Sequence, residues 1–85
     1  MRYVKIYVLM ETDTDTAYPI VSVYTDREQA IQTALMDIKG NQNVVIEVDE
    51  KDERYEGRDV WSCMHRSSLN GTDQWSTITR FEVGV

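Results

Sequence analysis

Cys63 and His65 are the side chains whose types and spacing most directly suggest chemistry. They lie two residues apart in a segment of alternating character, so both would project from the same side of a strand. Such a pair can supply a nucleophile and a base, or two metal ligands. Zinc sites use three or four protein ligands, however, and without a second Cys or His a carboxylate such as Asp59 would have to contribute. A half-buried thiol beside a surface imidazole explains the pair more simply, so we predict no metal site, no cofactor and no catalytic residue.

The spacing of the residues excludes several other kinds of chemical site. Asp13 and Asp15 resemble the start of a calcium loop, but Tyr18 then stands where glycine is required and Tyr24 where a glutamate should bind. The chain has no nucleophile elbow, phosphate-binding glycine loop or dinucleotide fingerprint. Paired carboxylates need a cleft to perform glycosidase-type chemistry, and a thin domain with one helix offers little cleft volume. We therefore expect a protein that is not an enzyme, with a small enzyme based on Cys63 and His65 as an alternative.

Acidic residues are concentrated in two short segments. The chain has 15 Asp and Glu against 9 Lys and Arg, which gives a net charge of −6. The first segment, residues 11–15, has three acidic residues and no basic one, and the second, residues 47–56, has six acidic and two basic residues. Together they carry a charge of −7, which leaves +1 for the rest of the chain. Their acidic residues are Glu11, Asp13, Asp15, Glu47, Asp49, Glu50, Asp52, Glu53 and Glu56.

This distribution of charge bears on the class of partner. A net negative chain does not bind nucleic acid or an anionic membrane through nonspecific electrostatics. Carboxylates spaced along a ribbon can instead pair with Lys and Arg that otherwise contact phosphates, so we predict a protein partner with a basic, nucleic-acid-binding surface. Alternatively, the acidic ribbon is a solubilising turn whose charges protect a sheet edge from aggregation.

Trp61 and Trp75 complete the set of candidate partner-binding residues. A tryptophan on an uncovered sheet face is a natural interface anchor, since Trp, Tyr and Arg dominate interface energetics. A tryptophan on a covered face is a core residue that removes much apolar area from water. Both alternatives are open for each of the two residues.

The strands that would position these residues follow from alternating patterns. Residues 3–11 alternate, with Val4, Ile6, Val8 and Met10 on one face and Tyr3, Lys5, Tyr7 and Leu9 on the other. A polar loop is expected at 12–16. Further strands are predicted at 19–24, 44–48, 59–66 and 74–83, with the charged connector at 49–57 and a hairpin loop around Asn70-Gly71.

A helix is predicted over residues 25–40. Thr25 to Glu28 has the form of a capping box, in which the Thr25 hydroxyl would accept from the Glu28 amide. Ile31, Ala34, Leu35 and Ile38 follow at helical spacing. Gly40 would supply a left-handed cap at the end of the helix.

These elements predict one α+β domain, residues 1–85, with the order β-β-α-β-β-β. One helix would cover one face of an antiparallel sheet of four to five strands. The other face would carry Tyr3, Tyr7 and one tryptophan, and it or a sheet edge could pair with a second copy. Because the chain has a single cysteine and no apparent targeting or membrane-spanning segment, we expect a cytoplasmic protein.

The chain begins with a predicted hairpin followed by a capped helix, in the segments Lys5 to Glu11, Ile20 to Tyr24 and Thr25 to Ala30. This order of elements resembles small acidic phage-type α+β proteins. Anti-CRISPR and other counter-defence proteins of phages share this size and acidity. The resemblance covers residues 3–39 and implies a protein-binding inhibitor, without assigning a site residue. We therefore expect an inhibitor that blocks a host nucleic-acid-binding complex; the alternative is an antitoxin-like or housekeeping adaptor for a basic partner protein.

Overall fold

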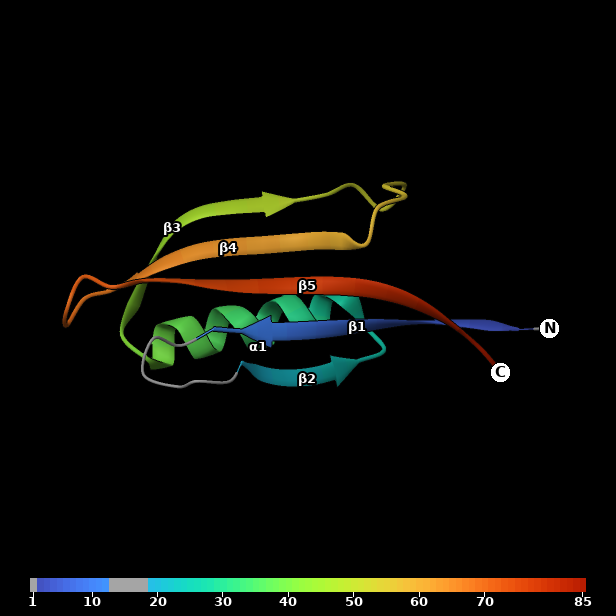
Figure 1. The fold of residues 1–85 in the computed structure, drawn as a ribbon, viewed down its shortest axis with the longest axis horizontal. Helices are drawn as coiled ribbons and strands as arrows, with labels where there is room; N and C mark the ends of the chain where they lie inside the picture. The colour runs from blue at the N-terminus through green and yellow to red at the C-terminus, as the bar shows by residue number, and fades with distance from the viewer. Residues whose placement is uncertain (1, 13–18) are drawn as a thin grey trace.

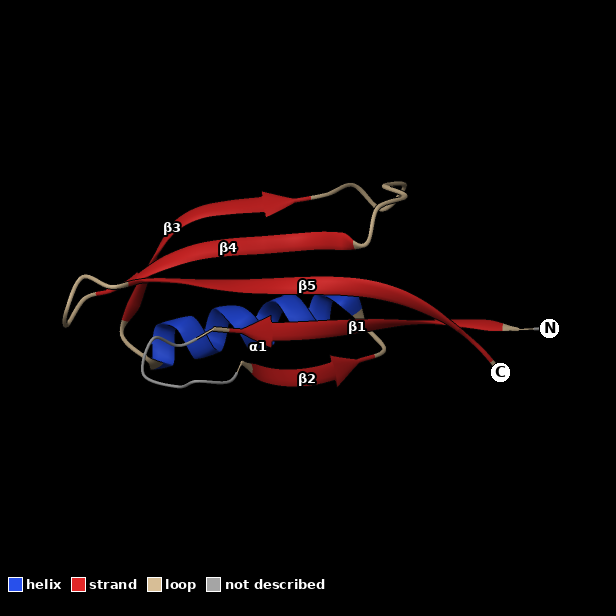
Figure 2. Ribbon diagram, in the orientation of Figure 1, coloured by secondary structure: helices blue, strands red, loops and turns tan. Residues whose placement is uncertain are grey.

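The computed structural model describes residues 2–12 and 19–85, which form a sheet with one helix on one face (Figures 1 and 2). Asp13, Asp15 and most of the predicted 12–16 loop lie outside the described residues. The elements, in chain order, are β1 (Tyr3–Glu11), β2 (Ile20–Tyr24), α1 (Arg27–Gly40), β3 (Asn43–Glu50), β4 (Asp59–Ser67) and β5 (Asp73–Gly84). Within these residues, no helix combines the length and apolar character needed to cross a bilayer.

The five strands lie in the order β2-β1-β5-β4-β3, and every neighbouring pair is antiparallel. The predicted α+β class, with an antiparallel sheet and one helix, is confirmed. Because α1 joins β2 at one edge to β3 at the other, it crosses the face of the strands between them (Figure 1). This crossing buries one sheet face, and among residues 2–12 and 19–85 no helix lies on the opposite face (Figure 1), which we call the uncovered face.

The pairing of β1 with β5 extends beyond the rest of the sheet. It runs to Tyr3 opposite Gly84, whereas β2 pairs with β1 only from Tyr7 onward and β4 pairs with β5 only as far as Thr79. Among the described residues, segments 3–6 and 81–84 therefore form a two-stranded ribbon without a third strand. Figure 1 shows both chain ends projecting past the helix.

α1 begins at Arg27, two residues after the predicted start, and ends at Gly40 as predicted, but the residues that cap it differ from the prediction. Asp26, in extended conformation, is the N-cap, and its carboxylate accepts from the Glu28 amide at 3.1 Å, so the prediction of Thr25 was wrong. At the other end, Gly40 is still helical and Gln42 adopts the left-handed conformation, with φ of 59°. Gln42 is held there because its amide donates to the Lys39 carbonyl and its own carbonyl accepts from the Ser68 amide.

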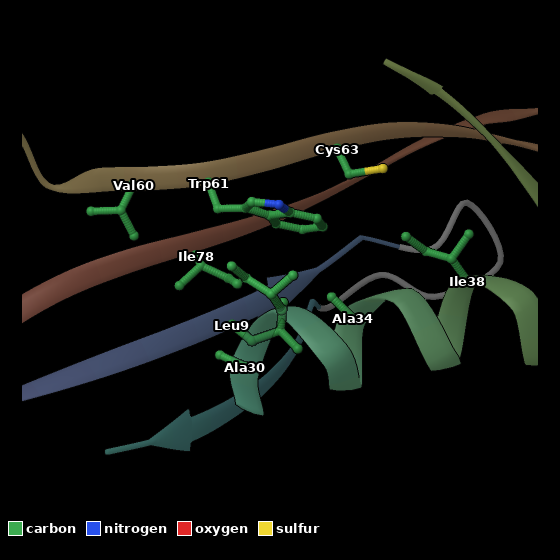
Figure 3. Close-up of a cluster of buried hydrophobic side chains, with 9 residues drawn as sticks. Leu9, Ala30, Ala34, Ile38, Val60, Trp61, Cys63 and Ile78 are labelled. Carbon is green, nitrogen blue, oxygen red and sulfur yellow. The ribbon is translucent and has the colours of Figure 1, made fainter. Parts of the chain in front are cut away.

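The core lies between α1 and the sheet (Figure 3). The helix contributes small or branched side chains, so its backbone can approach the strands closely, and Trp61 fills the space that they leave. Trp61 is only 2% exposed. The buried apolar residues are Leu9, Ala30, Ile31, Ala34, Ile38, Val60, Trp61, Cys63 and Ile78.

The face of β1 that the helix covers is the one that carries Tyr7 and Leu9. Leu9 pairs with Ile78, which pairs with Trp61 on the next strand, so the three side chains form one continuous layer beneath α1. The expectation that Tyr3 and Tyr7 occupy the uncovered face was therefore wrong. Tyr7 packs against the core, and Tyr3 lies on the same side of the strand, in the projecting ribbon.

Candidate protein-binding surface

The acidic segment 47–56 begins on β3, which is an edge strand of the sheet. Glu47 pairs with Met64 and Asp49 with Ser62, so both carboxylates belong to the uncovered face. Glu50 has the opposite orientation and lies 3.8 Å from the Arg27 guanidinium on the helix side. The part of the acidic segment that lies on β3 therefore divides its charge between the two faces of the sheet. Of its three carboxylates, only Glu47 and Asp49 lie on the uncovered face.

The loop that follows β3 carries Asp52, Glu53 and Glu56, all exposed. Its shape is fixed locally by Asp52, whose carboxylate accepts from the Arg54 amide at 2.8 Å and whose carbonyl accepts from the Tyr55 amide at 2.9 Å. These bonds turn the chain back toward β4 and leave the loop carboxylates directed to solvent.

Two arginines from other elements anchor the same loop. The Arg80 guanidinium donates to the Tyr55 carbonyl and, at 3.0 Å, to the Gly57 carbonyl. The Arg27 guanidinium donates to the Lys51 carbonyl. Because the cations bind backbone carbonyls, they hold the loop in place without neutralising its acidic side chains.

Several acidic residues of this segment have no cationic partner. Asp49 lies 3.4 Å from Lys51, and Asp52 lies 3.4 Å from Arg54, both in exposed pairs that contribute little to stability. In the part of the chain that the structure describes, Glu47, Glu53 and Glu56 form no ion pair within 4.0 Å. Their charges are thus available to a partner.

Trp75 lies on the same uncovered face as Glu47 and Asp49, with β4 between it and these carboxylates. It is 51% exposed and pairs with Met64, which in turn pairs with Glu47 on the edge strand. A shallow hollow of about 200 Å³ is formed by these residues, which we call the acidic–aromatic surface: Glu47, Asp49, Ser62, Met64 and Trp75. An aromatic anchor and two carboxylates that line one hollow suit a partner that presents apolar groups near Lys or Arg.

Trp61, the other tryptophan candidate, belongs to the core. Its side chain points from β4 toward α1 and is 2% exposed (Figure 3), so it offers no surface to a partner. Of the two alternatives, the core interpretation holds for Trp61, and the exposed position holds for Trp75.

Glu11 does not join the acidic segment of β3. It sits on the helix side of β1, half-buried and close to Asp37 of α1. Burial, and then the hydrogen bond and charge of Asp37, raise the pKa of Glu11 from 4.5 to about 7. Glu11 is therefore a half-buried carboxyl that is easily protonated. The sequence pattern did not reveal this, because Asp37 lies far along the chain.

Cys63 and His65 both point toward the helix side, and both are buried. The prediction of a surface imidazole was wrong. The Asn43 side-chain amide donates to His65 Nδ1 at 2.9 Å, so Nε2 carries the proton and donates to the Ser76 hydroxyl at 3.1 Å. Burial lowers the pKa of His65, in keeping with this neutral ring.

This arrangement does not activate a nucleophile. His65 Nε2 acts as a donor to Ser76 and so cannot withdraw the hydroxyl proton. Burial raises the pKa of the Cys63 thiol, which keeps it protonated. Within residues 2–12 and 19–85, no group of three or more His, Cys, Asp and Glu side chains is placed to hold a metal ion.

Ser62 and Met64 are surface residues that the sequence analysis did not select. The signal was present, since they alternate with Trp61 and Cys63 and must share a face opposite to them. Comparison of the chain with protein-family models, curated proteins and solved structures found no match.

Proposed function

We propose that this chain is a non-enzymatic, protein-binding inhibitor that occupies a basic, nucleic-acid-binding surface of a partner protein. The observation that carries the proposal is the acidic–aromatic surface, where Glu47 and Asp49 line one hollow with the exposed Trp75. Trp75 supplies apolar anchoring, and the carboxylates pair with the Lys and Arg that otherwise contact phosphates.

Charge and geometry support a protein partner rather than nucleic acid. The chain has a net charge of −6, which opposes binding to phosphates. Glu47 and Asp49 are two residues apart on one strand, so their side chains emerge about 6.6 Å apart along a straight edge. Two carboxylates at this spacing suit two cationic side chains of an extended segment, and complementary fields of this kind speed association.

The specific form of the proposal is a phage-type counter-defence protein that acts in the host cytoplasm on a CRISPR-type complex. It rests on the resemblance of the hairpin and capped helix to small acidic phage proteins. An antitoxin-like or housekeeping adaptor would use the same surface on another basic partner, so the identity of the bound protein separates the two.

Affinity capture from a bacterial lysate that contains CRISPR effectors tests the proposal, with mass spectrometry to identify bound proteins. The baits are the wild type, the double variant Glu47→Gln/Asp49→Asn and the variant Trp75→Ser. Glu28→Gln and Tyr3→Ser are matched controls, since these exposed residues lie on the helix side. Each capture is repeated with competing DNA.

We expect the wild type and both controls to recover the same nucleic-acid-binding complex, and DNA to displace it. Trp75→Ser should weaken that binding by at least about 10-fold, the usual effect of removing an aromatic anchor. Equal recovery by all five baits, or a complex that DNA leaves in place, would show that the contact lies elsewhere and would contradict the proposal.

A further inference from the structure

One side of β3 is open in the part of the chain that the structure describes. β3 pairs with β4 on its other side, and Figure 1 shows it at the margin of the sheet. The backbone groups on the open side of such an edge strand are a template for an added strand. The other edge, β2, has five residues and no charged side chain. Of the two edges, only β3 therefore combines an open backbone with charge.

The pairing with β4 determines which backbone groups of β3 point outward. The Lys51 amide donates to the Val60 carbonyl at 2.9 Å, and the register places these two residues directly opposite each other. Hydrogen-bonded and non-hydrogen-bonded pairs alternate along an antiparallel ladder, so Asp49 and Glu47 also bond to β4. The amide and carbonyl of Val48 therefore point away from β4, toward the open side.

The open stretch of backbone is short, and both of its ends are defined. A register shift interrupts the regular pairing just before Glu47. At the other end, the Arg27 guanidinium donates to the Lys51 carbonyl and holds the strand where the acidic loop begins. Between these ends, Val48 and, by the same alternation, Glu50 have outward amides and carbonyls. A strand of four or five residues, which is a common strand length, matches this stretch.

We propose that the partner adds an extended basic segment to β3 as a sixth strand, antiparallel like every other pair in the sheet. The inference rests on the proposed function, since it takes the partner of the acidic–aromatic surface to be basic, and it specifies how that partner binds. Toward the added strand, Glu47 and Asp49 occupy non-hydrogen-bonded pairs, in which opposite side chains lie closest. Lys or Arg at alternate positions of the segment would then lie opposite both carboxylates, on the uncovered face.

The residue between the two cations should be apolar. It lies opposite Val48, which is 45% exposed on the helix side of the sheet and pairs with the buried Cys63 on β4. An apolar side chain there would cover Val48 and extend the core to the edge. Glu50 already lies 3.8 Å from the Arg27 guanidinium, so it needs no further cation. The recognised pattern is therefore basic–apolar–basic.

The same carboxylates disfavour a second copy of this chain at the edge. Two β3 strands paired antiparallel about Val48 would place Glu47 of each copy directly opposite Asp49 of the other. Like charges directly opposite each other destabilise a strand pair, whereas opposite charges stabilise it. Charge complementarity therefore assigns the edge to a basic segment.

A capped peptide, Thr-Lys-Val-Lys-Val-Lys-Thr, tests this mode of binding by NMR at about 50 mM salt, where charge pairing is weakly screened. At saturation, exchange of the Val48 and Glu50 amides with solvent should slow at least about 10-fold. The amides of Glu47 and Asp49 already bond to β4, so their exchange should change little. The same peptide with glutamate in place of lysine is the control and should not bind.

Modified peptides test the backbone pairing without altering the protein. The valine amides of the peptide face β3, so N-methylation of both valines should weaken binding at least about 10-fold. N-methylation of two lysines, whose amides point away from β3, should leave binding nearly unchanged.

A variant of β3 tests the same pairing from the side of the protein. Val48→Pro removes one outward amide, and proline is tolerated on an edge strand where its nitrogen faces solvent. This variant should bind the peptide several-fold more weakly, whereas Val48→Ile, which keeps the amide, is the matched control and should bind as the wild type does. Circular dichroism establishes that both variants are folded.

Three results would overturn strand addition. The first is peptide binding that Glu47→Gln/Asp49→Asn weakens but that neither slows exchange at Val48 and Glu50 nor responds to N-methylation. The carboxylates would then bind through side chains alone, and the proposed function would stand without this inference. The second is slow exchange of those two amides in the protein alone, which would show that the edge is already paired, with a second copy or within the chain. The third is a wild type that does not bind the peptide.

Discussion

Replacing Glu11 by Gln should stabilise the protein at high pH and have little effect at low pH. The pKa of Glu11 is raised from 4.5 to about 7 by burial and by Asp37, so the folded state binds this proton more tightly than the unfolded chain. Stability is therefore lost as the pH rises from about 4.5 through 7, because the folded state must then hold a half-buried carboxylate beside a second one. Gln supplies amide hydrogens that can donate to Asp37, and it removes the charge.

The expected stabilisation by Glu11→Gln follows from the pKa shift of Glu11. At about 1.4 kcal/mol for each pKa unit, the rise from 4.5 to about 7 corresponds to roughly 3 kcal/mol. Solvent reaches part of the Glu11 side chain, so we expect about 1–3 kcal/mol for the stabilisation of Glu11→Gln at pH 8. The difference from the wild type at pH 4 should fall below about 0.5 kcal/mol.

Urea unfolding of both proteins at pH 4 and pH 8 measures these free energies, and subtracting the wild type at each pH cancels the titration of other groups. Glu47→Gln is the control, since Glu47 is exposed on β3 and its replacement should change stability little at either pH. Equal free energies for Glu11→Gln and the wild type at pH 8, or a stabilisation as large at pH 4, would refute the reasoning.

Three further predictions concern the core, the acidic loop and the thiol. Trp61→Ala should lower the free energy of unfolding by about 3–5 kcal/mol, whereas Trp75→Ser should change it by less than about 1 kcal/mol, as denaturant unfolding would measure. Arg80→Met removes the bonds to two loop carbonyls, so amides of residues 51–58 should exchange with solvent faster while those of α1 do not; unchanged exchange in the loop would contradict the anchoring role. Cys63 is buried with a raised pKa, so a thiol reagent should modify it slowly in the folded protein and rapidly in urea; rapid modification of the folded protein would exclude this position for the thiol.

The α+β class could be predicted because local patterns are strong where one helix packs on a sheet. The alternation of residues 3–11 and the spacing of Ile31, Ala34 and Ile38 both record which side chains share a face. The alternation alone does not say which face of β1 the helix covers, since both faces carry apolar side chains. One face has Val4, Ile6, Val8 and Met10, and the other has Tyr7 and Leu9. Packing decides it, because Leu9 completes a layer with Ile78 and Trp61 from strands distant in sequence.

The candidate site was predictable only in part, because it too depends on contacts between strands that are distant in sequence. The cluster of acidic residues at 47–56 is a local feature, and β3 and its loop expose it. Trp61 and Trp75 look alike in sequence, and they differ only because β4 turns one toward α1 while β5 turns the other away. The link between Glu11 and Asp37 joins two elements whose contact no local pattern encodes.

The salt dependence of binding to the captured partner tests the central claim most directly. Affinities of the wild type and of Glu47→Gln/Asp49→Asn would be measured between about 50 and 500 mM salt. We predict that the wild type weakens steeply with salt, while the double variant binds more weakly at low salt and has a shallower slope, so that the two affinities converge at high salt. Identical slopes and affinities for the two proteins would contradict a binding surface built on these carboxylates.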